Sequence, residues 1–151
     1  MVEFAVVVTL LLLLVFGIIA FGLTIYSDVN LSNAAREGAR NAVVANFSCG
    51  GTCTGTTPAS GIADFVKNDT NLKKQSVSVM VQFPASYAVG QEVLVCAIYP
   101  MTDVGGITSP FLGGRYLKTT TKMRLEQTPA NTDTTTYADT PPSGQSWSFC
   151  S

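Results

Sequence analysis

The chain has 151 residues and a formal net charge of −1, and only 13% of its residues are charged. A nearly neutral chain has little bulk electrostatic attraction for a polyanion, so we expect no nucleic-acid partner. The chain has no histidine, no phosphate-binding loop and no GxSxG sequence. Histidine is both the commonest general base and the commonest metal ligand. We therefore expect no enzymatic activity, no metal and no cofactor.

The first predicted element is a long apolar helix. Residues 4–26 contain no charged side chain, and as a helix this run is about 34 Å long, enough to cross a bilayer. A cleavable signal peptide is disfavoured, because its apolar region is shorter and follows basic residues, whereas here Glu3 precedes the run. Two interpretations remain: a plain membrane anchor, or a helix that resides first in a membrane and then packs against sister helices in a fibre.

The charges that flank the run favour the fibre. No Lys or Arg precedes it, and Arg36 and Arg40 follow it, although an N-terminus held in the cytoplasm normally carries basic residues. We therefore expect that a basic leader is removed before Met1. The free α-amino group of Met1 would then pair with Glu3 of a neighbouring subunit, because an unpaired carboxylate is costly to bury. The alternative is a Glu3 that is solvated at the membrane surface.

Two glycines, Gly17 and Gly22, lie inside the apolar run. Each weakens a helix by about 1 kcal/mol relative to alanine. They either allow close packing between helices or mark where the helix bends or melts locally in a fibre. Both interpretations stay open.

The helix is predicted to continue to about residue 46, since no proline interrupts it. Apolar residues recur there at three- and four-residue steps, which is typical of an amphipathic helix: Val29, Ala35, Ala39, Ala42 and Val43. Glu37 lies within reach of Arg40 at i,i+3. The predicted organisation is a helix over 1–47, apolar over 1–26 and amphipathic over 27–47, followed by a globular domain over 48–151.

Two stretches of this helix, VEFAVVVTLLLLLVFGIIAFG at residues 2–22 and NAAREGAR at residues 33–40, resemble the N-terminal signature of TadE-like proteins. These are pilin-like subunits of tight-adherence systems, in the type IV filament superfamily. The resemblance covers about the first 45 residues, and KTTTKMRLEQ at 118–127 is more weakly similar to a later strand. This chain departs from the superfamily pattern at two places. The acidic residue is third here, as Glu3, whereas it is usually fifth in the mature chain of the superfamily. Thr9 lies near the position of a proline that is frequent in the family.

The resemblance implies partners and a location. Prepilin peptidase would cleave before the mature chain, and an inner-membrane pilus assembly machinery would incorporate it into a homo-oligomeric helical filament. The chain would reside in the inner membrane before assembly and in a filament on the surface of a prokaryotic cell afterwards.

The domain is predicted to be α+β. Thr57 and Pro58 are typical of a helix start, and this short helix should end near Asn68. Three strands are predicted from alternating or continuous apolar patterns, at residues 76–83, 91–100 and 116–126. An antiparallel sheet packed on the amphipathic half of the long helix buries their apolar faces.

The cysteines are predicted to form two disulfides, because an even number follows a membrane segment. They are Cys49, Cys53, Cys96 and Cys150. Of the three possible pairings we favour Cys49–Cys53, which is short and flanks two glycines, and Cys96–Cys150, which would fix the C-terminal tail to a strand. A metal or redox role for the CxxxC pattern is disfavoured, because no other ligand type is close to it.

Residues 128–145 are rich in Thr and Pro and offer little to bury, so we expect them to wrap the surface before residues 146–150 anchor the end. This tract and two N-x-S/T patterns supply candidate glycosylation sites: Asn46, Asn68, Thr134, Thr135 and Thr136.

The predicted function is that of a structural pilin subunit, which polymerises through its N-terminal helix into an extracellular Tad-type pilus. The alternatives are a minor TadE-like pseudopilin that primes or caps another pilus, and a single-span membrane-anchored binding module.

Overall fold

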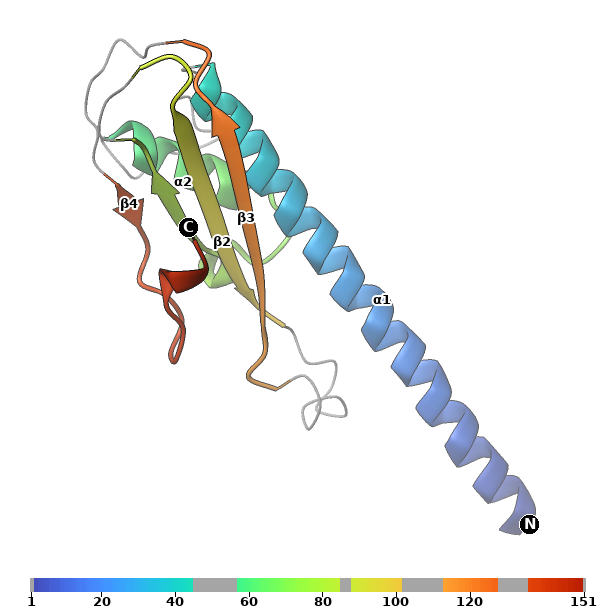
Figure 1. The fold of residues 1–151 in the computed structure, drawn as a ribbon. Helices are drawn as coiled ribbons and strands as arrows, with labels where there is room; N and C mark the ends of the chain where they lie inside the picture. The colour runs from blue at the N-terminus through green and yellow to red at the C-terminus, as the bar shows by residue number, and fades with distance from the viewer. Residues whose placement is uncertain (1, 45–56, 85–87, 102–112, 128–135, 151) are drawn as a thin grey trace.

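The computed structural model describes residues 2–44, 57–84, 88–101, 113–127 and 136–150 (Figure 1). A long N-terminal helix stands beside a small four-stranded antiparallel sheet. This is an α+β arrangement, so the predicted fold class is confirmed.

The N-terminal helix, α1 (Val2–Val43), is one uninterrupted α-helix, about 63 Å long at 1.5 Å per residue. Its first half projects beyond the sheet, and its second half lies against it (Figure 1). The residues of the second half that face the core are mostly small: Leu31, Ala34, Ala35, Ala39 and Ala42. Small side chains bring the helix axis close to the elements that it contacts.

One predicted core position of α1 is wrong. Val29 is 50% exposed, whereas Leu31 is fully buried. Successive helical residues differ in direction by 100°, so two positions along the helix place these side chains on nearly opposite faces. Val29 fits the apolar spacing in the sequence, but the sheet packs on the face that carries Leu31.

The second helix, α2 (Pro58–Asp69), starts as predicted. The Thr57 hydroxyl accepts a hydrogen bond from the backbone N–H of Ser60, and the Ser60 side chain accepts one from the backbone N–H of Thr57, so the two form a capping box. Ile62 and Val66 are buried on its apolar side, which packs on α1.

The sheet contains β1 (Ser78–Gln82), β2 (Glu92–Pro100), β3 (Tyr116–Arg124) and β4 (Tyr137–Ala138), in the order β3-β2-β1-β4. The three predicted strands are confirmed, with β2 in the interior. The two-residue β4 was not predicted. It pairs with β1 at Met80 and Val81.

The main core lies between the sheet and the two helices. The inward residues alternate along the strands as predicted, and the buried ones include Val79, Val81, Val93, Val95, Ala97 and Leu117. Cys96 and Ile98 are buried as well but lie outside this cluster. The C-terminal segment passes over their side of the sheet (Figure 1), and the predicted Cys96–Cys150 disulfide joins it to β2, with 6.0 Å between the Cα atoms. The predicted Cys49–Cys53 bond lies outside the described residues.

Candidate assembly surface

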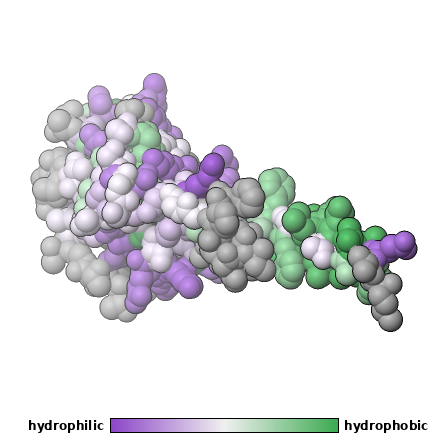
Figure 2. All heavy atoms as spheres, turned by 90° about the horizontal axis from the view of Figure 1, so that it is seen from below, coloured by the Kyte–Doolittle hydropathy of each residue, from purple (hydrophilic) through white to green (hydrophobic). Residues whose placement is uncertain are grey.

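The first half of α1 exposes an apolar surface that the other described residues do not cover. Figure 2 shows it as a hydrophobic projection from a largely hydrophilic body. Large apolar side chains between positions 4 and 26 form this surface. The most exposed include Phe4, Leu10, Leu13, Ile18 and Phe21, whose side chains are between 64% and 75% exposed. Soluble monomers rarely expose a continuous apolar surface of this size, so this one is an interaction surface.

The polar side chains of this region hydrogen bond to their own helix. The Thr9, Thr24 and Ser27 hydroxyls donate to carbonyls one turn earlier, at 2.8–2.9 Å, and the Asn30 side-chain amide does the same at 2.9 Å. An unpaired donor is costly to bury. These bonds let α1 enter an apolar environment without that cost.

By length and composition α1 is able to cross a membrane, and within the described residues it is the one helix of this kind. The apolar window that gives this property is almost entirely uncovered inside the chain. In the core helix of a soluble protein this window would be mostly buried, whereas the described residues leave it almost entirely uncovered.

The predicted assembly residues lie along this surface. Glu3 is exposed in the first turn of α1, while Met1 lies outside the described residues. At Gly17 and Gly22 an added Cβ atom would meet no atom within 4 Å, so packing against the described residues does not require glycine there. The α-helix continues through both glycines without interruption.

The charged residues of the second half of α1 are exposed, and Arg36, Glu37 and Arg40 lie on its outer side. Glu37 and Arg40 do not form the predicted i,i+3 pair, since the one salt bridge among the described residues joins Lys67 and Asp139. An ion pair between two long, fully hydrated side chains gains little free energy against their conformational entropy.

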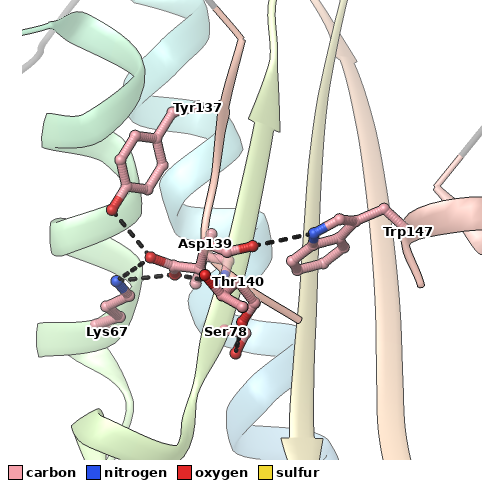
Figure 3. A network of polar contacts seen from close by, with 7 residues as sticks. Lys67, Ser78, Tyr137, Asp139, Thr140 and Trp147 are labelled. Carbon is pink, nitrogen blue, oxygen red and sulfur yellow. Dashed lines mark hydrogen bonds and ion pairs between the residues drawn. The ribbon is translucent and has the colours of Figure 1, made fainter. Parts of the chain in front are cut away.

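A polar cluster on the other side of the domain was not predicted. Its centre is Asp139, which follows β4 (Figure 3). The Lys67 ammonium group lies 2.8 Å from one carboxylate oxygen and donates to the other at 2.9 Å. The Tyr137 hydroxyl donates at 2.9 Å and the Val79 backbone N–H at 2.8 Å. The Asp139 carboxylate thus joins the tail to α2 and to β1.

The same cluster changes the acidity of a phenol. Burial, with smaller contributions from the Asp139 hydrogen bond and charge, raises the pKa of Tyr137 to about 12 from its ordinary 10.0. The Trp147 indole N–H donates to the Asp139 carbonyl at 3.2 Å. The cluster therefore fixes the C-terminal segment.

Within the described residues, no group of His, Cys, Asp and Glu is arranged to hold a metal ion.

The described glycosylation candidates lie apart from one another. Asn68 is in the last turn of α2, where its side-chain oxygen accepts a hydrogen bond from Lys74 at 2.8 Å. Thr136 is exposed immediately before β4. Asn46, Thr134 and Thr135 lie outside the described residues.

A long helix with an uncovered apolar half and a small α+β domain packed on its other half fits a pilin-like protein. A family model described as TadE-like protein matches residues 1–40. The resemblance seen in the sequence is thereby confirmed over that segment, and the match fits a pilin-like protein related to Tad pili. No curated protein and no solved structure matches the chain.

Proposed function

We propose that this chain is a structural pilin subunit that polymerises through α1 into an extracellular Tad-type pilus. The observation that carries the proposal is the uncovered first half of α1, on a helix whose second half packs one face against a compact domain. In a fibre the domains lie outside and the apolar halves bury one another, as sister helices do in a bundle.

The energetics support association. Burial of a large apolar side chain contributes roughly 1.5–3 kcal/mol before costs, and the first half of α1 exposes more than ten such side chains. Their sum exceeds the roughly 4–15 kcal/mol that association costs. Contacts of this head-to-tail kind do not close on themselves and generate helical filaments.

In this proposal the chain occurs in two states, one before and one after assembly. Before assembly α1 lies in the inner membrane, where prepilin peptidase and the pilus assembly machinery act on it. In the fibre, Glu3 pairs with the α-amino group of Met1 of a neighbouring copy and so sets the axial position of each subunit. In the fibre Gly17 and Gly22 allow close contact between helices, because glycine has no side chain to separate the backbones. The chain is divided, in this proposal, into a helix over 1–47 and a domain over 48–151.

A second candidate is a minor pseudopilin that primes or caps another pilus. The match to TadE-like proteins over residues 1–40 supports both candidates. They differ in stoichiometry, because a shaft subunit is the bulk of the fibre and a minor subunit is a trace component.

Shearing intact cells tests the proposal. The released fraction is examined by electron microscopy and its protein composition is measured by mass spectrometry. Fibres composed mainly of this chain, with Met1 as the first residue, are the expected result. Fibres in which the chain is a trace component support the minor pseudopilin. Recovery from the membrane fraction alone contradicts both and indicates a membrane-anchored module.

A further inference from the structure

Three charged side chains on the second half of α1 have no ionic partner among the described residues. Arg36, Glu37 and Arg40 are all exposed, and the one salt bridge among the described residues involves neither arginine nor Glu37. Both signs of charge occur within five consecutive positions of one rigid helix.

These charges lie on the side of α1 that faces away from its domain. At 100° per residue, Arg36 points about 130° and Arg40 about 170° away from the mean direction of the buried residues in this half of the helix. The buried residues that define this direction are Ser27, Leu31, Ala34, Ala35, Gly38, Ala39, Ala42 and Val43. Glu37 lies at one flank of the outer face, next to the arginines.

The outer face of the second half of α1 lies on the same side of the helix as part of the apolar surface of the first half. A single stripe of exposed residues at three-, four- and seven-residue steps runs along it: Leu11, Val15, Ile18, Gly22, Val29, Asn33, Arg36 and Arg40. Since α1 is one uninterrupted helix, a parallel helix packed along the apolar part of this stripe also runs beside its charged end.

We propose that Glu37 of one copy pairs with Arg36 or Arg40 of a neighbouring copy. The inference rests on the proposed function, which supplies a parallel neighbour. Along the helix axis Arg36 lies about 1.5 Å below Glu37 and Arg40 about 4.5 Å above it. The side chains are therefore level when neighbouring helices are offset axially by about 1.5 Å in one direction or about 4.5 Å in the other. Charges at the flanks of a coiled-coil seam pair between helices in the same manner.

The partner that fits this face is a second copy of the chain. A face with one sign of charge would repel its copy, whereas a face with both signs is complementary to itself. The pair would extend the contact between copies from the apolar half of α1 into the half that carries the domain.

Charge reversal tests the pair. Glu37→Arg makes the face wholly basic, and the double substitution Arg36→Glu with Arg40→Glu makes it wholly acidic. Each variant is expected to lower the yield of sheared fibres by about fivefold or more, because like charges then meet at every repeated contact. The thermal unfolding of the detergent-solubilised chain should not change. Glu126→Arg, at an exposed residue after β3, is the matched control and should assemble like the wild type.

Co-expression of the two variants separates a pair between copies from a pair within one helix. A basic copy beside an acidic copy restores attraction between copies, but neither chain alone regains an internal pair. The expected result is recovery of fibre yield, with both variants in the same fibres by mass spectrometry. Failure to recover overturns the inference. So does a wild-type yield from either variant alone, which would mean that the face is solvated. If the wild-type chain forms no fibres, the proposed function fails and this inference fails with it.

Discussion

Asp139 shows how one side chain organises the end of this chain. Its carboxylate receives the Lys67 ammonium group from α2, the Val79 N–H from β1 and the Tyr137 hydroxyl from β4. The backbone of Asp139 contributes as well, since its N–H donates to the Val79 carbonyl at 3.0 Å. A carboxylate with several donors in place is stabilised as an anion, so the tail is fixed at its start by this cluster and at its end by the Cys96–Cys150 disulfide.

The raised pKa of Tyr137 predicts a loss of stability at alkaline pH. The pKa is about 12 in the folded chain against an ordinary 10.0, so the folded state holds the phenol proton more tightly than the unfolded state. This contribution to stability is complete below pH 10 and is lost as the pH rises through 12. Thermal unfolding of the detergent-solubilised chain between pH 9 and pH 12 measures it. Tyr137→Phe should be less stable at pH 9 by about 1 kcal/mol and should lose less further stability between pH 10 and pH 12. An equally steep loss in Tyr137→Phe would contradict the assignment.

The contact between α1 and α2 determines how closely the long helix approaches the domain. The helices meet where Gly38 faces Val66, and a Cβ atom added at Gly38 would overlap the Val66 Cγ2 atom. Val66 is fully buried, and a β-branched side chain has few alternative rotamers in a helix. The glycine is therefore required by the packing of two elements and not by its own backbone, which is helical.

Gly38→Ala is expected to destabilise the domain, by about 1–3 kcal/mol from overpacking, partly offset by a gain in helix propensity of about 1 kcal/mol. Chemical unfolding of the detergent-solubilised chain measures the net change. Val66→Ala in the same chain should recover part of the loss, since it removes the overlapping methyl group. The matched control is Gly17→Ala, where an added Cβ atom meets nothing within 4 Å. A Gly38→Ala chain as stable as the wild type would show that the two helices can separate at no cost.

The whole molecule is amphipathic along its length. One end is an uncovered apolar helix, the other is a domain with its own core, and α1 is the rigid connection between them. Water suits the domain of an isolated copy but not its apolar end, and a membrane interior suits the apolar end but not the domain. A membrane covers the apolar end of one copy, and a fibre covers it with other copies, so the same surface serves both stages of the proposed function.

The proposed role of Glu3 predicts a defect in assembly and not in insertion. Glu3→Ala should lower the yield of sheared fibres by about tenfold or more, because the α-amino group of the neighbouring copy is left buried without its partner. The amount of chain in the membrane fraction should not fall. Glu3→Asp keeps the charge and should retain more assembly than Glu3→Ala. An unchanged fibre yield in Glu3→Ala would exclude the proposed role.

The sequence by itself determined the features that arise from local patterns. The apolar run of α1, the start of α2 at Thr57 and Pro58, the alternation along β1 and β3, and the continuous apolar run of β2 each depend on residues within a few positions of one another. The apolar part of the candidate assembly surface was predicted for the same reason.

Only the tertiary structure decided which side of the second half of α1 is buried, because Val29 and Leu31 are both apolar and the choice depends on where the sheet packs. Only the tertiary structure revealed β4 and the Asp139 cluster, because a two-residue strand has no periodicity and the cluster joins Lys67 to a residue 72 positions away.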